Sequence, residues 1–159
     1  MRELERLKEK IQKEQTIQLS SDFTNGGAIL GVVISVVAAF FLVPKILNNP
    51  EGFQANMLIA GLLLLVLIFL TFYQLFFAVE AELKGKKLKM KKVIGKKYEV
   101  DVSQVEKVSS FQSKSTKYTT LKFKDNNGNP EKALILNSNS IIFGKEVTAG
   151  EVIKLAQQI

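Results

Sequence analysis

The side chains that could act as nucleophiles in this sequence are serines and lysines, and nothing nearby would activate them. Ser109, Ser110 and Ser113 lie close together, but the chain contains no histidine to serve as their general base. The absence of cysteine excludes thiolate nucleophiles and disulfides. No glycine-rich phosphate loop, paired-carboxylate motif or metal-ligand spacing is present. We therefore expect a protein that is not an enzyme and that holds no cofactor or metal ion.

A cluster of lysines is the strongest candidate for a binding site. The chain holds 22 basic and 15 acidic residues, a formal net charge of +7. Many of the basic residues crowd into one stretch: Lys84, Lys86, Lys87, Lys89, Lys91, Lys92, Lys96 and Lys97. On one interpretation they mark the cytoplasmic side of a membrane segment and protect the edge of a sheet. On the other they bind anionic lipid head groups, each lysine contributing about 1 kcal/mol near an anionic leaflet.

The element that positions this cluster is an apolar run that ends just before it. Residues 57–79 read MLIAGLLLLVLIFLTFYQLFFAV and carry no charge. This run exceeds the ~20 helical residues needed to cross ~30 Å of hydrocarbon. Residues 27–43, GAILGVVISVVAAFFLV, form a second and shorter apolar run. Since a bilayer offers no partners to backbone groups, both runs are predicted to be transmembrane helices.

Small residues recur every four positions in the shorter run, at Gly27, Gly31, Ser35 and Ala39. This spacing is typical of a helix face that another helix approaches closely. The simpler interpretation is a contact with the second span of the same chain, and the alternative is a homodimer face. Neither span contains an ionisable residue, which favours a membrane anchor over a pump or coupled transporter.

The distribution of charge predicts the orientation of this hairpin. Residues 44–56, between the spans, carry one lysine and one glutamate, whereas lysines crowd after the second span. By the positive-inside rule, 44–56 is an extracytoplasmic loop and both termini are cytoplasmic. The preference for lysine over arginine, with many asparagines and isoleucines, resembles the usage of low-GC bacteria. We therefore expect a multi-pass protein of the bacterial inner membrane.

Residues 1–26 precede the hairpin, and a cytoplasmic helix is predicted over residues 1–19. Leu4, Leu7 and Ile11 fall on one face of such a helix. A solvated helix leading to the membrane is the simpler interpretation. The alternative is an amphipathic helix that binds the membrane interface or a partner.

Residues 80–159 follow the hairpin and change to a period of two, which predicts short strands. Leu88 and Met90, for example, alternate with lysines. The sequence Thr-Ala-Gly-Glu over residues 148–151 is a capping box, and an amphipathic helix is predicted after it. We predict a cytoplasmic antiparallel barrel or sandwich capped by a C-terminal helix. The whole chain is then an α+β membrane protein.

The stretch VIGKKYEVDVSQVEKV, residues 93–108, resembles the second- and third-strand region of bacterial pleckstrin-homology-like (PH-like) domains. Such domains often follow a two-helix membrane hairpin in small bacterial proteins. The resemblance extends over residues 80–159 and includes the closing helix. It implies a bent antiparallel barrel with a binding or scaffolding role. It also implies that Lys84, Lys86, Lys87 and Lys89 lie where eukaryotic relatives hold phosphoinositide head groups.

These features together predict a membrane-anchored scaffold that presents a PH-like domain at the cytoplasmic face. Its expected partners are the bilayer, anionic lipid and another protein, including a second copy of the chain. The alternative is an accessory or immunity-type subunit that acts through its hairpin within a larger membrane complex. Nucleic acid is not an expected partner, because the aromatic residues of the strands are better explained as core.

Overall fold

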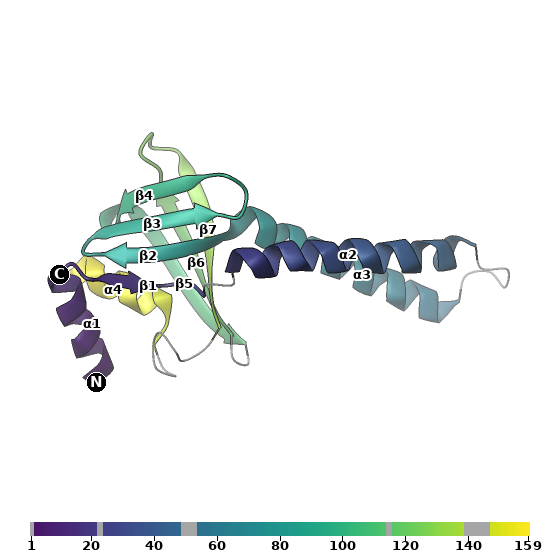
Figure 1. Ribbon diagram of the computed structural model, residues 1–159, viewed down its shortest axis with the longest axis horizontal. Helices are drawn as coiled ribbons and strands as arrows, with labels where there is room; N and C mark the ends of the chain where they lie inside the picture. Colours follow the sequence, from purple (N-terminus) through teal and green to yellow (C-terminus); the bar gives the residue numbers. More distant parts are fainter. Residues whose placement is uncertain (1, 22–23, 49–53, 114–115, 139–146) are drawn as a thin grey trace.

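A computed structural model describes residues 2–21, 24–48, 54–113, 116–138 and 147–159. Two long helices, α2 (Thr24–Leu47) and α3 (Ala55–Phe77), project as a hairpin from a sheet domain (Figure 1). Both are long and apolar enough to cross a membrane, and only 11% of the most apolar stretch of each is buried. Their side chains are therefore largely uncovered within this chain, whereas those of a core helix are covered.

The helix boundaries differ from the predicted spans, 27–43 and 57–79, at both ends of the hairpin. Helix α2 continues through Pro44 to Leu47, since proline removes only its own amide donor and its carbonyl accepts a hydrogen bond from Asn48. Helix α3 stops at Phe77, and the sheet domain begins at Ala78 without a linker. Ala78 and Val79 are fully buried in the sheet domain, which explains their apolar character. The centre of the predicted loop, residues 49–53, lies outside the described residues.

The sheet is open and mixed, where the sequence predicted an antiparallel barrel or sandwich. Its strand order is β4-β3-β2-β7-β6-β5, and β1 also pairs with β2. The strands are β1 (Thr16–Gln18), β2 (Ala78–Lys84), β3 (Lys87–Lys92), β4 (Lys97–Asp101), β5 (Val105–Ser113), β6 (Thr116–Lys124) and β7 (Pro130–Ser138). All described pairings are antiparallel except that of β2 with β7, which are parallel where Ala78 and Val79 face Leu134 and Ile135.

The C-terminal helix lies where the sheet fails to close. Strands β4 and β5 are the two ends of the strand order, and the short 3-10 helix η1 (Val102–Gln104) joins them. The side chain of Gln157, in helix α4 (Ala149–Gln158), donates to the carbonyl oxygens of Val102 (2.8 Å) and Val105 (3.1 Å). Helix α4 thus satisfies backbone acceptors at this junction that a closed barrel would pair between strands.

The core of the domain lies between the sheet and α4. Val152, Ile153 and Ala156 of α4 are fully buried in one apolar cluster with side chains from the strands. The predicted capping box is confirmed, because Thr148 and Glu151 each accept a hydrogen bond from the other's backbone N–H.

The N-terminal segment packs on the sheet domain, and it is not the single helix expected over residues 1–19. Helix α1 (Arg2–Gln12) ends early, and the chain continues as β1 along the edge of β2. Leu7 and Ile11 are buried in the core cluster, and α1 contacts α4. The chain leaves the helix because the spacing of its apolar residues changes to a period of two. Ile17 and Leu19 alternate with polar residues and are buried, as is typical of a strand.

Candidate functional site

The predicted lysine site is carried mainly by the outer face of strands β2, β3 and β4. Alternation along β3 places Leu88 and Met90 in the core and turns Lys87, Lys89 and Lys91 outward. The turn between β2 and β3 is tight, with Gly85 at a positive φ of 56°. This turn fixes the register, so each outward lysine of β3 has a defined neighbour on either side.

Carboxylates stand beside every outward lysine of β3. The strand register gives three rows across β2, β3 and β4: Glu80–Lys91–Lys97, Glu82–Lys89–Glu99 and Lys84–Lys87–Asp101. The middle row carries more negative than positive charge. The Glu99 carboxylate lies 3.8 Å from the ammonium groups of both Lys87 and Lys89. The lysine run is strongly basic in sequence, but the face that it forms is close to electrically balanced.

Two further lysines of the cluster are held by one carboxylate on another strand. Glu131 of β7 accepts hydrogen bonds from Lys92 (3.0 Å) and Lys96 (3.3 Å). The side chains of Lys92 and Glu131 are only 13% and 18% exposed, so this pair is shielded from solvent. Partial burial by itself raises the pKa of Glu131, but hydrogen bonds and charge from Lys92, with a hydrogen bond from Lys96, hold that pKa below its usual 4.5.

The remaining lysines of the cluster do not converge on one point. Lys86 lies in the β2–β3 turn, where its charge and a backbone hydrogen bond from Ser103 act on Asp101. The backbone and side-chain hydrogen bonds from Ser103 are the larger effects, and with the charges of Lys86 and Lys87 they hold the pKa of Asp101 below its usual 3.8. Among the described residues, Lys84, Lys86, Lys91 and Lys97 form no ion pair within 4.0 Å.

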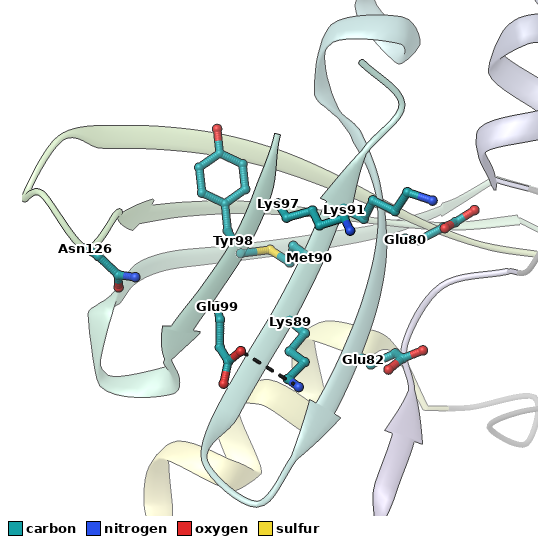
Figure 2. A pocket seen from close by; sticks show the side chains of 9 residues that line it. All are labelled: Glu80, Glu82, Lys89, Met90, Lys91, Lys97, Tyr98, Glu99 and Asn126. Atoms are coloured by element: carbon teal, nitrogen blue, oxygen red, sulfur yellow. Dashed lines mark ion pairs between the residues drawn. The ribbon is translucent and has the colours of Figure 1, made fainter. Parts of the chain in front are cut away.

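A hollow of about 520 Å³ lies on this face (Figure 2). It is lined by Glu80, Glu82, Lys89, Met90, Lys91, Lys97, Tyr98, Glu99 and Asn126. A second hollow of about 660 Å³, beside the β2–β3 turn, likewise mixes lysines with Glu14, Glu99 and Asp101. An anionic head group in either hollow would meet carboxylates as well as lysines. Such a mixture of charges suits a polypeptide surface that carries both signs.

The predicted helix-packing residues are divided between two environments. Gly31 and Ser35 face Thr71 of α3, and the Ser35 and Thr71 hydroxyl oxygens are 3.0 Å apart. A Cβ atom on Gly31 would lie 3.4 Å from the Thr71 methyl group. Gly27 lines a smaller hollow at the root of the hairpin, and Ala39 is half-buried. The structure thus places Gly31 and Ser35 in a contact between the two helices of one chain.

The serines considered as nucleophiles lie on the edge strand β5. Ser110 Oγ is 2.9 Å from the hydroxyl oxygen of Thr119, and no acid or base contacts it among the described groups. Within the described part of the chain, no group of three histidine, cysteine, aspartate or glutamate side chains gathers to hold a metal ion.

The sequence reasoning missed the carboxylates that balance the lysines. The two in β2 could have been predicted from the sequence. Glu80 and Glu82 alternate with apolar residues before a glycine turn, a pattern that predicts a hairpin in which they pair with the lysines of β3. Glu131 could not, since it lies more than thirty residues from Lys92 and Lys96 along the chain.

Comparison with family models, curated proteins and solved structures finds no match to this chain. The class of protein is therefore defined by architecture alone. It is an α+β chain in which a hairpin of two long apolar helices interrupts a mixed-sheet domain capped by a C-terminal helix.

Proposed function

We propose that this chain is a membrane-anchored binding protein without enzymatic activity. Helices α2 and α3 cross the inner membrane of a bacterial cell, and the PH-like sheet domain binds a protein partner at the cytoplasmic face. The observation that carries the proposal is the junction of Phe77 with Ala78, where α3 passes into β2 with no intervening residue. An anchor joined in this way holds the domain directly at the bilayer surface.

The uncovered surface of the hairpin supports the anchoring role. Many large apolar side chains along both helices are more than half exposed, among them Phe40, Phe41 and Phe69. Exposing such side chains to water costs about 1.5–3 kcal/mol each relative to burial. A bilayer removes this cost. The excess of lysine after the second helix orients the domain toward the cytoplasm.

The charge pattern of the sheet favours a protein partner over anionic lipid. The outward lysines of β3 are flanked by Glu80, Glu82, Glu99 and Asp101, which would repel an anionic surface. Rows of mixed sign instead give a protein partner a pattern that can be matched charge by charge. Support for a PH-like domain comes from the two groups of strands, β2–β4 and β5–β7, with a helix at their junction.

The alternative, an accessory or immunity-type subunit acting through its hairpin, is less favoured. It depends on the small-residue face of α2, and Gly31 and Ser35 of that face contact Thr71 of α3 in the same chain.

Orientation is tested by labelling single cysteines in intact cells, since the chain has no native cysteine. A membrane-impermeant maleimide should label Asn48→Cys, beside the loop, and should label Ser103→Cys only after the cells are opened. Labelling of Ser103→Cys from outside would overturn the cytoplasmic assignment.

The binding face is tested by crosslinking in native membranes, comparing the wild-type chain with a Glu82→Lys, Glu99→Lys variant. Lys122→Gln, Lys154→Gln serves as a control on exposed positions away from this face. We expect crosslinked protein partners to be lost in the first variant and retained in the control. A partner set that is the same in all three chains would contradict the assignment of this face.

A further inference from the structure

Few large apolar side chains are exposed on the sheet domain. Among the described residues outside α2 and α3 they are Leu4 (41%), Ile94 (55%), Phe111 (61%) and Ile159 (36%). A single exposed apolar residue is ordinary and needs no explanation. The positions of the two most exposed, Ile94 and Phe111, are not ordinary, because both lie on the side of the domain from which the helical hairpin emerges.

Ile94 lies in the turn between β3 and β4. Strand β3 runs back toward the hairpin, so Lys92 pairs with Val79, two residues beyond the end of α3. The turn continues in the same direction, and its backbone is fixed by a 2.9 Å hydrogen bond from the Lys92 N–H to the Lys96 carbonyl. Since β3 also contacts α3, Ile94 lies level with the last turn of that helix.

Phe111 lies in β5, at the other end of the strand order from β4. Its ring stacks on that of Tyr118, with centroids 4.8 Å apart and planes 8° from parallel. Tyr118 in turn lines a hollow of about 210 Å³ with Gly27 near the start of α2 and Gln74 in the last turn of α3. In Figure 1 the β3–β4 turn lies beside the root of the two helices, and the β5–β6 hairpin ends below that root on the side of the domain from which the helices project.

The root of the hairpin is where a bilayer interface would lie. Helix α3 has 23 residues, a length of about 34 Å at about 1.5 Å per residue. Crossing ~30 Å of hydrocarbon therefore uses nearly the whole helix, which brings its C-terminal end close to the head groups. Lys132 of β7 lies over the rings of Tyr73 (4.9 Å) and Phe77 (5.0 Å) there. Aromatic rings and lysine at one level are typical of a membrane interface.

We propose that Ile94 and Phe111 enter the interface of the same bilayer that α2 and α3 cross, so that the sheet domain rests on the membrane at two points. The inference depends on the membrane anchorage proposed above. We choose the bilayer over a protein partner because the two side chains lie near the membrane-crossing hairpin, at the level of the bilayer surface. The residues two positions before and after Phe111 on the strand suit this position, because Ser109 and Ser113 are uncharged and exposed.

Site-specific fluorescence quenching in vesicles of phosphatidylcholine tests the inference on the full chain. Single cysteines at Ile94→Cys and Phe111→Cys carry an environment-sensitive dye, and nitroxide lipids quench it at shallow or deep positions. Two further variants keep both apolar residues and label the same two ends of the sheet domain, here called the tips. They are Lys97→Cys, at the β3–β4 turn, and Ser113→Cys, at the end of β5. Ser103→Cys, at the end of the domain far from the hairpin, is the water-exposed control, and Ile34→Cys in α2 reports on the span.

We expect blue-shifted emission and loss of fluorescence with the shallow quencher at both tips, loss with the deep quencher at Ile34→Cys, and no change at Ser103→Cys. If Ile34→Cys is quenched while either tip stays water-exposed, the two-point contact is overturned and the anchor stands. Tips that stay exposed in vesicles would point to a protein partner as their occupant. If Ile34→Cys is not quenched, the anchorage itself fails, and the inference fails with it.

Discussion

The hydroxyl oxygens of Ser35 and Thr71 lie 3.0 Å apart and join the middle of α2 to α3. Both side chains are buried, although the surfaces of the two helices are mostly uncovered. Ser35 donates its hydroxyl proton to the Gly31 carbonyl at 2.9 Å, which leaves Thr71 as the donor in the contact between helices. Gly31 makes room for this arrangement, because it places no side chain against Thr71.

Thr71→Val should weaken the hairpin slightly, because it removes the donor while keeping the shape. Hydrogen bonds between membrane helices contribute about 0.6 kcal/mol on average. Gly31→Leu should weaken it more, since its side chain would occupy the space of the Thr71 methyl group. Unfolding of the detergent-solubilised chain by dodecyl sulfate measures both, with Val36→Ala, on an exposed position, as the control. Equal midpoints for Gly31→Leu and the control would exclude a packing role.

Ile11→Ala should destabilise the sheet domain although Ile11 precedes both apolar helices in the chain. Its side chain is 3% exposed in the core cluster, and such truncations cost about 2–5 kcal/mol. Leu4→Ala, on the same helix but 41% exposed, should cost much less. Thermal unfolding of the full chain in detergent, followed by circular dichroism, measures the difference. If the two variants melt together, α1 does not pack on the domain in solution.

Gly150→Ala should destabilise the domain even though alanine is the better helix former. A Cβ atom at this position would clash with Ser110 Oγ and lie 2.8 Å from Cγ1 of Val108. Overpacking typically costs about 1–3 kcal/mol, more than the ~1 kcal/mol that alanine gains over glycine in a helix. Thermal unfolding should show a lower midpoint than in Gln158→Ala, an exposed control on α4. A higher midpoint would mean that α4 shifts freely on β5.

Lys132→Gln should loosen the attachment of α3 to the sheet domain. The Lys132 ammonium group lies over the rings of Tyr73 and Phe77, and such contacts contribute about 0.5–2 kcal/mol. Lys132→Arg should retain most of this, and Lys122→Gln, exposed on the neighbouring strand, should have little effect. Hydrogen exchange at the α3–β2 junction is the measurement. Unchanged exchange in Lys132→Gln would show that the cation does not stabilise the junction.

Glu131 should make the stability of the domain depend on pH in the acid range. Its pKa is held below the usual 4.5, so the unfolded chain takes up a proton at higher pH than the folded one. The stabilisation is therefore present above about pH 4.5 and is lost as the pH falls through the lowered pKa. Glu131→Gln should be less stable than the wild type by about 1–3 kcal/mol at neutral pH, because Lys92 loses its carboxylate.

Acid titration of unfolding separates this effect from that of other carboxylates. The difference between the wild type and Glu131→Gln should shrink as the pH falls from about 4.5 through the lowered pKa of Glu131, below which both chains carry a neutral side chain at this position. Asp101, whose pKa is also lowered, continues to contribute in both proteins. A difference that stays constant down to pH 2 would contradict the ion pairs with Lys92 and Lys96.

Local patterns in the sequence predicted the elements that depend on local physics. The two apolar runs became helices, and the alternation around Leu88 and Met90 became a strand. The capping box at Thr148 and Glu151 also formed as expected, since its hydrogen bonds join residues three apart. The candidate lysines lie where alternation predicts, but their charge balance depends on neighbours from other strands.

The sequence by itself determined a hairpin of two apolar helices, a following domain of short strands and a closing helix. A long uncharged run, a period of two and a helix cap each act within a few residues. Only the tertiary structure decided that α1 and β1 join the domain beyond the hairpin, that β2 pairs in parallel with β7, and that Glu131 holds Lys92 and Lys96. These contacts join residues far apart in the chain, so they form only when the sheet and helices have packed and no local pattern records them.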